Sequence, residues 1–165
     1  MVITFIGMPG CGKSCMGRAV AGKLKMKLID SDRLIERRYG KKLQELIDEL
    51  GVEEFRRIEE ETLLSIEGDN LIISTGGSAI FGKEAMEHLK NTSTVVYLRV
   101  PYEVIEKRLG SLKRRGVVFE EGQTLRDIYD VRCPLYEKYA DIVIDCNNDT
   151  DIQETAIKIA EFFEG

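Results

Sequence analysis

The sequence predicts an α/β fold in which three layers (α/β/α) are built around a five-stranded parallel sheet. Five short apolar runs alternate with longer segments of helical periodicity, and the runs lack the polar and apolar alternation of a half-solvated strand. This pattern suits strands buried on both faces, because helices cover both sides of a parallel sheet. We expect the strands at residues 2–6, 27–30, 71–74, 94–100 and 141–145.

Helices are predicted where apolar residues recur every three or four positions. The clearest stripes run through residues 43–50, 55–66 and 152–163. Gly51 and Gly68 are expected to end the first two of these helices. About forty residues separate the second and third strands, which is more than a simple crossover needs. We therefore interpret residues 31–68, approximately, as a substrate-binding insertion.

Size and charge limit the classes of function. The 165 residues, of which 43% are hydrophobic, suit a single domain spanning 1–165. The formal net charge of −5 gives the surface as a whole no attraction for nucleic acids or anionic membranes, so neither is expected as a partner. Any anionic ligand must then be held by a local cluster. We expect a monomer that acts on small molecules.

The sequence favours neither export nor a zinc site. The apolar run at residues 1–7 is too short for a signal peptide or a membrane span. The four cysteines form no C-x-x-C pair and accompany a single histidine, His88, which argues against a Cys/His metal site. We expect a cytoplasmic protein with reduced thiols.

One motif predicts nucleotide binding. Gly7-Met8-Pro9-Gly10-Cys11-Gly12-Lys13-Ser14 matches the P-loop pattern G-x-x-x-x-G-K-S/T, between an apolar run and a helical pattern. In a P-loop, backbone N–H groups and a helix N-terminus face phosphate oxygens. Lys13 would reach the β and γ phosphates, and Ser14 would offer a hydroxyl to Mg²⁺. We therefore expect a nucleoside triphosphate with Mg²⁺, and nucleotide contacts from Gly10, Cys11, Gly12, Lys13, Ser14 and Cys15. The P-loop alone does not distinguish a small-molecule kinase from a switch GTPase or a motor ATPase.

Two carboxylates follow the second predicted strand, at the sheet edge where α/β proteins bind ligands. Asp30 and Asp32 can have different roles: one carboxylate can lie near the water shell of the metal, and the other can face a hydroxyl acceptor. Alternatively, one of them caps a helix that begins at Arg33. The runs at 71–75 and 95–99 end without the aspartate that motor and switch proteins usually place there, which favours a small-molecule kinase.

Arginines and paired glycines are candidates for the acceptor site. Arg56 lies on an amphipathic helix and Arg132 near a helix end, and arginine binds a carboxylate through two parallel N–H bonds. Arg57 and Arg126 are expected on solvated helix faces. Gly76-Gly77 follows the third strand, where it either lets a ligand approach the backbone or forms a plain tight turn.

A candidate lid spans residues from about 110–124. This segment lacks helical periodicity and contains three adjacent cations, Lys113, Arg114 and Arg115. We interpret it as a lid that closes over an anion, and the alternative is a solvated surface loop.

Several motifs together resemble the shikimate kinase family, in order and with similar spacing over nearly the whole chain. They are the P-loop, Asp30-Ser31-Asp32, Phe55-Arg56-x-x-Glu59, Thr75-Gly76-Gly77, Arg132-x-Pro134-Leu135-Tyr136 and Ala140-Asp141. The resemblance implies a P-loop kinase fold of the nucleoside-monophosphate-kinase type. It also implies ATP-dependent phosphorylation of the 3-hydroxyl of shikimate, a step in the biosynthesis of aromatic amino acids.

For the nucleotide end of the site, the resemblance implies a role for each matching residue. It places Lys13 on the phosphates, Ser14 on Mg²⁺ and Asp30 in the water shell of the metal. It also places Arg108 against the adenine and Arg115 in the lid.

For the acceptor end, the resemblance implies that Asp32 contacts the accepting hydroxyl and that Arg56 and Arg132 bind the carboxylate. Gly76 and Gly77 would contact the acceptor through their backbone. The implied catalytic residues are Lys13, Asp32 and Arg115.

Two departures from the family pattern bear on the acceptor. Ser78 stands where the family usually has a third glycine, and the lid reads Arg115-Gly116-Val117-Val118 where the family usually has R-P-L-L. Two alternatives therefore stay open. One is a kinase of another small hydroxylated acid such as gluconate, and the other is a regulator that binds the nucleotide without turnover.

Overall fold

The computed structural model describes residues 1–110, 117 and 122–164. The strands are β1 (Val2–Ile6), β2 (Lys27–Asp30), β3 (Leu71–Ser74), β4 (Thr94–Arg99) and β5 (Ile142–Asp145). The α-helices are α1 (Lys13–Leu24), α2 (Ser31–Tyr39), α3 (Leu43–Leu50), α4 (Val52–Ser65), α5 (Lys83–Thr92), α6 (Tyr102–Leu109), α7 (Leu125–Tyr139) and α8 (Ile152–Glu164). A short 3-10 helix, η1 (Ala79–Phe81), follows β3.

All five strands are parallel and lie in the order β2-β3-β1-β4-β5. The predicted sheet is thus confirmed. The last two strands are each one residue shorter than expected. Val100 precedes Pro101, which begins the turn into α6. Asp141 lies just before β5, where its N–H donates to Val95 O and its carboxylate accepts from Val95 N–H, both at 2.8 Å.

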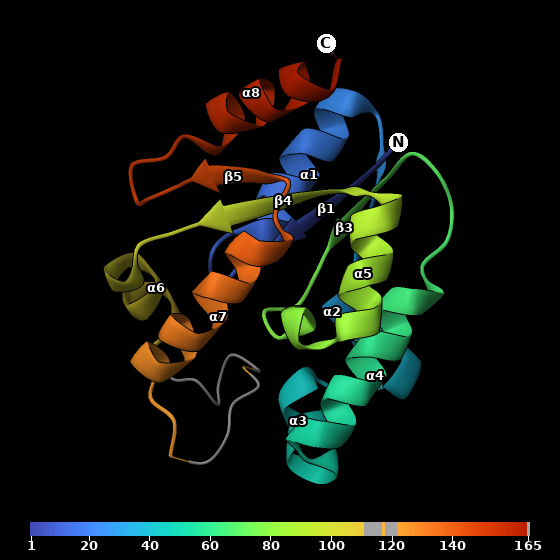
Figure 1. Ribbon diagram of the computed structural model, residues 1–165, viewed down its shortest axis with the longest axis vertical. Helices are drawn as coiled ribbons and strands as arrows, with labels where there is room; N and C mark the ends of the chain where they lie inside the picture. The colour runs from blue at the N-terminus through green and yellow to red at the C-terminus, as the bar shows by residue number, and fades with distance from the viewer. Residues whose placement is uncertain (111–116, 118–121, 165) are drawn as a thin grey trace.

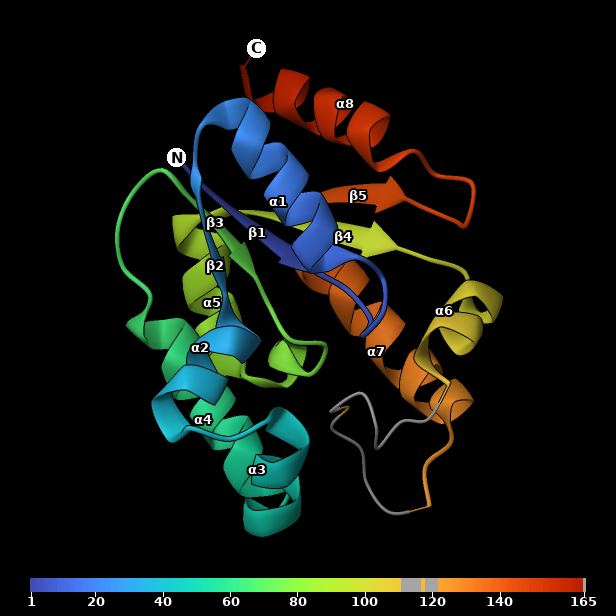
Figure 2. The ribbon, with the colours of Figure 1, turned by 180° about the vertical axis from the view of Figure 1, so that it is seen from behind.

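Helices cover both faces of the sheet and so form the three predicted layers. Figure 1 shows α5 and α7 in front of the strands. Figure 2, seen from behind, shows α1 and α8 on the opposite face. Among the described residues, no helix has both the length and the apolar character needed to span a membrane.

Burial differs between the central and the edge strands. Side chains of β1, β3 and β4 are almost all buried, as their unalternating sequences predict. The same expectation is wrong for the edge strands, because β2 is only partly covered and β5 alternates between half-buried and exposed residues. An edge strand has a neighbour on one side only, and the helices that cover the sheet leave its outer side in solvent.

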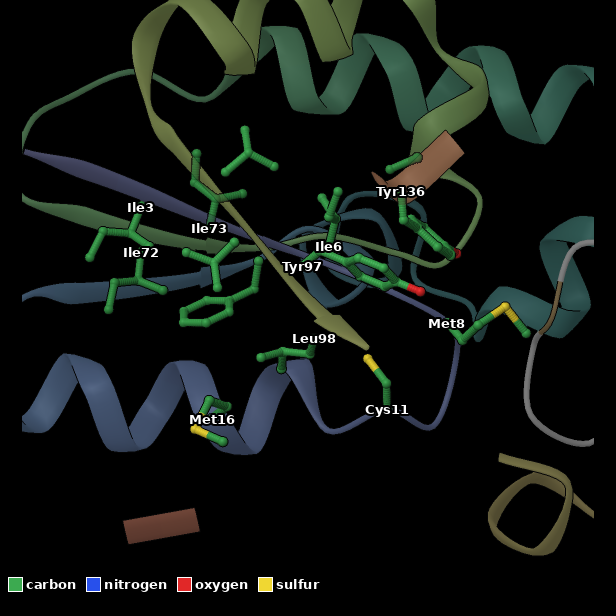
Figure 3. Packing of buried hydrophobic residues seen from close by; sticks show 14 of the residues in the cluster. Ile3, Ile6, Met8, Cys11, Met16, Ile72, Ile73, Tyr97, Leu98 and Tyr136 are labelled. Carbon is green, nitrogen blue, oxygen red and sulfur yellow. The ribbon is translucent and has the colours of Figure 1, made fainter. Parts of the chain in front are cut away.

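The main core surrounds β1, as Figure 3 shows for Ile3, Ile72 and Leu98, which are fully or almost fully buried. In the same view Tyr97 of β4 faces Tyr136 of α7, with 5.2 Å between the ring centroids. Burial of such large rings contributes much of the packing energy of a small domain. This contact fixes α7 against the sheet.

A second, smaller core holds α2, α3 and α4 together, and these helices lie to one side of the sheet (Figure 1). It consists of Ile35, Leu46, Ile47, Phe55 and Ile58. Gly51 ends α3 as predicted, with its N–H donating to Ile47 O at 2.9 Å. Gly68 does not end α4, because the chain leaves the helix at Ile66, whose side chain is drawn into the core.

Candidate active site

The P-loop joins β1 to α1. Gly10 and Gly12 adopt φ angles of +79° and +96°, which residues with side chains rarely tolerate. A Cβ atom at Gly7 would lie 2.9 Å from Leu98 O. Glycine at these positions lets the loop curl around the start of α1, so that the first N–H groups of the helix face the space inside the loop.

The Lys13 ammonium lies inside this loop. Its side chain is buried, and Nζ donates to the carbonyl oxygens of Gly7 (2.6 Å) and Met8 (3.0 Å). Cys11 Sγ lies 3.7 Å away from the same nitrogen. A phosphate oxygen that enters the loop can replace these carbonyls and accept a stronger, charge-assisted hydrogen bond.

Ser14 and Asp30 bring oxygen donors together beside the loop. Ser14 Oγ donates to Asp30 Oδ2 at 2.8 Å. The other carboxylate oxygen accepts from the backbone N–H groups of Asp32 (3.0 Å) and Arg33 (3.3 Å) and so caps α2. The helix therefore begins at Ser31 and not at Arg33. Asp30 both caps it and faces Ser14, and a hydroxyl with a carboxylate is a donor set that Mg²⁺ accepts.

Asp32 has the environment of a general base. Loss of hydration is the largest cause that raises the pKa of Asp32 to about 7, and the charges of Glu59 and Asp30 raise it further. The Lys13 ammonium opposes this rise. A carboxylate with a pKa near neutrality can hold a proton taken from a hydroxyl at physiological pH.

The Gly76-Gly77 turn passes so close to its neighbours that it has no room for side chains. A Cβ atom at Gly76 would lie 2.5 Å from Glu59 Oε2 and 2.6 Å from Asp32 Oδ1. At Gly77 it would lie 2.5 Å from Pro9 Cδ. These close approaches explain the two glycines, since the turn lies between a pair of carboxylates and the P-loop.

Arg56 of α4 and Arg132 of α7 meet at one aromatic ring. Their Cζ atoms lie 4.3 and 5.5 Å from the centroid of Phe81, which follows β3 in η1. Arg132 lies inside α7 and not near its end, because the helix continues through Pro134. Two guanidinium groups from separate helices can together bind a carboxylate.

Tyr136 positions Arg132. The two residues lie four positions apart on the same face of α7, and both are buried. The Tyr136 hydroxyl donates to the backbone oxygen of Gly77, and its ring packs on Tyr97. The contact with the sheet therefore holds Arg132 beside the glycine turn.

Arg57 and Arg126 lie on solvated faces, as expected. Arg57 is exposed and pairs with Glu54 and Glu61 on α4. Arg126 pairs with Asp130 one turn along α7, at 3.2 Å. These pairs are exposed and add little to stability.

One cavity of about 310 Å³ joins most of the predicted site residues. Its lining includes Gly10, Gly12, Lys13, Ser14, Cys15, Asp30, Asp32, Glu59, Gly76, Gly77, Ser78 and Arg132. Val117, the described residue in the middle of the candidate lid, is buried and also lines it. The phosphate loop, the carboxylates and an arginine thus face a common space.

Of the predicted residues that the structure describes, three are not part of this lining. Arg56 lies over the ring of Phe81, which Arg132 also contacts, and Arg108 donates to Gly10 O at 3.0 Å from outside the P-loop. The Cys11 side chain is buried and its N–H donates to Met8 O at 3.1 Å within the loop. Arg115 lies outside the described residues.

Comparison with known proteins identifies this combination of features. Residues 9–164 match the family model for shikimate kinase. The chain belongs to the shikimate kinase family. A shikimate kinase from Pasteurella multocida is 36% identical over 146 residues, which cover 86% of this chain and 83% of that protein. One from Francisella tularensis subsp. novicida is 34% identical over 164 residues, with coverages of 97% and 93%.

Solved structures of shikimate kinases have the same fold. The enzyme from Acinetobacter baumannii, in complex with shikimate, superposes with a TM-score of 0.90 at 32% identity, over 99% of this chain and 92% of that one. The enzyme from Aquifex aeolicus gives a TM-score of 0.85 at 28% identity, with coverages of 100% and 97%. The chain is therefore a small-molecule kinase with ATP as its co-substrate.

Sequence reasoning assigned no role in the site to Glu59 or Phe81. Glu59 is 3% exposed and lies between Ser78 and the glycine turn. A signal for Glu59 was available, because it follows Phe55 by four positions and so shares the buried face of α4. Phe81 gave no such signal, since a short turn after a strand has no periodicity that would place its ring.

Proposed function

We propose that this member of the shikimate kinase family transfers the γ-phosphoryl group of ATP to the 3-hydroxyl of shikimate. The observation that carries the proposal is that the P-loop, Asp32 and Arg132 line a single cavity. An acceptor that has a carboxylate beside Arg132 and a hydroxyl beside Asp32 would point that hydroxyl toward the phosphates. Holding two reactants in line in this way accounts for most of the rate acceleration in phosphoryl transfer.

In the proposed reaction, Lys13 exchanges its bonds to the P-loop carbonyls for bonds to the β and γ phosphates. Backbone N–H groups between Gly10 and Cys15 face the other phosphate oxygens. Arg108, which already lies against Gly10, packs on the adenine. Arg115 offsets the charge that develops on the transferred group.

Mg²⁺ is part of the proposal. Ser14 Oγ and the Asp30 carboxylate, 2.8 Å apart at the edge of the cavity, fit the preference of this ion for hard oxygen donors. Ser14 would contact the ion, and Asp30 would accept hydrogen bonds from its bound water. The ion supplies charge neutralisation at the β and γ phosphate oxygens.

Asp32 accepts the proton of the reacting hydroxyl. The pKa of about 7 of the Asp32 carboxyl supports this role, because the group can hold the proton at physiological pH. Arg56 and Arg132 bind the acceptor's carboxylate, while Gly76 and Gly77 bring the backbone into contact with it. The apolar side chains of Leu43, Phe55, Leu109 and Val117 line the same cavity and help to exclude water, which would otherwise hydrolyse ATP.

The proposal includes a monomeric enzyme that acts in the cytoplasm on small molecules. The net charge of −5 supports the exclusion of nucleic acid as a partner, since the surface as a whole does not attract a polyanion. Size-exclusion chromatography with light scattering would test the monomer directly.

The test of the proposed function is a coupled assay of ADP release with Mg-ATP and shikimate, run beside quinate, gluconate and no acceptor. We expect strong stimulation by shikimate alone and formation of the 3-phosphate. Stimulation by a different acid and not by shikimate would leave the phosphate site in place but contradict the acceptor. ATP binding without stimulation by any acceptor would favour a regulator that has lost turnover.

A further inference from the structure

The Ser78 hydroxyl is one of the departures from the family pattern at this site. It follows the Gly76-Gly77 turn, where the family usually has a third glycine, and its side chain is buried. Ser78 Oγ donates to Glu59 Oε1 at 2.6 Å. The hydroxyl is thus engaged by a carboxylate that belongs to the site.

Glu59 stands at the centre of the acceptor end. Its second oxygen, Oε2, lies where a Cβ of Gly76 would come within 2.5 Å. Burial raises the pKa of the Glu59 carboxyl, and the hydrogen bond from Ser78 is the strongest influence that lowers it again, followed by the charges of Arg132 and Arg56. Glu59 is therefore a buried carboxylate surrounded by the cations that we assign to the acceptor.

We propose that Ser78 is a positioning residue, whose hydroxyl holds the Glu59 carboxylate in the orientation from which it aligns Arg132 and Arg56 for the carboxylate of the acceptor. This inference rests on the proposed function. A buried carboxylate that loses a hydrogen-bond donor is destabilised, and it gains by moving toward the donors that remain. The positive charges that act most strongly on Glu59 are those of Arg132 and Arg56, so the loss of the Ser78 hydroxyl would disturb the groups that bind the acceptor.

The backbone at Ser78 permits a clean test. Its φ and ψ of −95° and 3° are accessible to any residue, so alanine removes the hydroxyl without backbone strain. Ser78→Gly restores the residue that the family usually has. For a control, Ser93→Ala removes a partly buried hydroxyl away from the cavity. This hydroxyl donates to Leu89 O at 2.6 Å and is hydrogen-bonded to Thr4 Oγ1 at 2.7 Å.

Steady-state kinetics separate positioning from a general loss of structure. For Ser78→Ala and Ser78→Gly we expect the KM for shikimate to rise about fivefold to tenfold. This is less than the full effect of one hydrogen bond to a charged group, because the hydroxyl acts on the acceptor only through Glu59. The KM for ATP and kcat should stay within about twofold, because Lys13 and Ser14 are untouched. Ser93→Ala should leave all three constants unchanged.

A double-mutant cycle tests whether the effect passes through Glu59. In a Glu59→Gln background, Ser78→Ala should add less than about twofold to the KM for shikimate. Unchanged shikimate KM in folded Ser78→Ala, equal losses for ATP and shikimate, or full additivity with Glu59→Gln would each overturn the positioning role. If the unmodified enzyme does not respond to shikimate, the proposed function itself fails, and the inference that rests on it fails as well.

Discussion

Gly77→Ala places a methyl group where the ring of Pro9 already lies. The new carbon would come within 2.5 Å of Pro9 Cδ and 3.1 Å of Pro9 N, whereas carbon atoms in contact are normally about 3.5 to 4.0 Å apart. The glycine turn and the P-loop must therefore separate by about 1 Å. Neither can yield easily, because Pro9 is part of the loop backbone and Tyr136 holds Gly77 O from the other side.

Both stability and catalysis should respond to this clash. Overpacking of this kind typically costs about 1 to 3 kcal/mol, which corresponds to a fall in Tm of roughly 3 to 10 °C in a domain of this size. A displacement of about 1 Å between the phosphate loop and the acceptor turn can lower kcat/KM by about a hundredfold. We would measure thermal unfolding by circular dichroism and shikimate-dependent ADP release.

Gly22→Ala is the matched control for this substitution. Gly22 lies inside α1, and a Cβ atom there would meet nothing within 4 Å. Alanine should stabilise the helix by about 0.5 to 1 kcal/mol without altering kinetics. If Gly77→Ala behaved like Gly22→Ala, with unchanged or higher Tm and normal turnover, the close packing of the turn on the P-loop would be refuted.

Three further substitutions test the roles assigned above. Lys13→Ala should abolish phosphoryl transfer while circular dichroism shows an intact fold, and near-normal turnover would contradict the P-loop assignment. Arg132→Ala should raise the KM for shikimate at least tenfold with little change in the KM for ATP, because a charged, two-bond contact to the carboxylate is lost. An equal rise in KM for both substrates, or no rise for shikimate, would count against this role. Asp32→Asn should abolish turnover yet stabilise the ligand-free protein. In urea unfolding, the gain in the free energy of unfolding should be about 2 kcal/mol larger at pH 8 than at pH 5. The sign follows from the pKa of Asp32, which rises from 3.8 to about 7 on folding, so that stability due to the bound proton is lost as pH rises toward and through 7; a stabilisation that is independent of pH would contradict the raised pKa.

Local patterns in the sequence predicted the parts of the molecule that depend on neighbouring residues. The apolar runs predicted all five strands to within a residue at each end, because a strand buried under helices needs a short, continuous apolar segment. The P-loop could be placed between β1 and α1 because the motif is contiguous and its glycines permit the positive φ angles of the turn. Burial of the edge strands could not be predicted, since strand order in the sheet is not a local property.

The contacts that organise the site were decided only by the tertiary structure. Asp32, Glu59, Gly76 and Arg132 lie on four separate segments, and only the parallel order of β2 and β3, with α4 and α7 beside them, brings these residues around one cavity. The sequence by itself determined which residue types were available for phosphate, metal and carboxylate binding. The hydrogen bond from the Ser78 hydroxyl to Glu59 depends on the distance between two segments that are far apart in the sequence, and no local pattern encodes that distance.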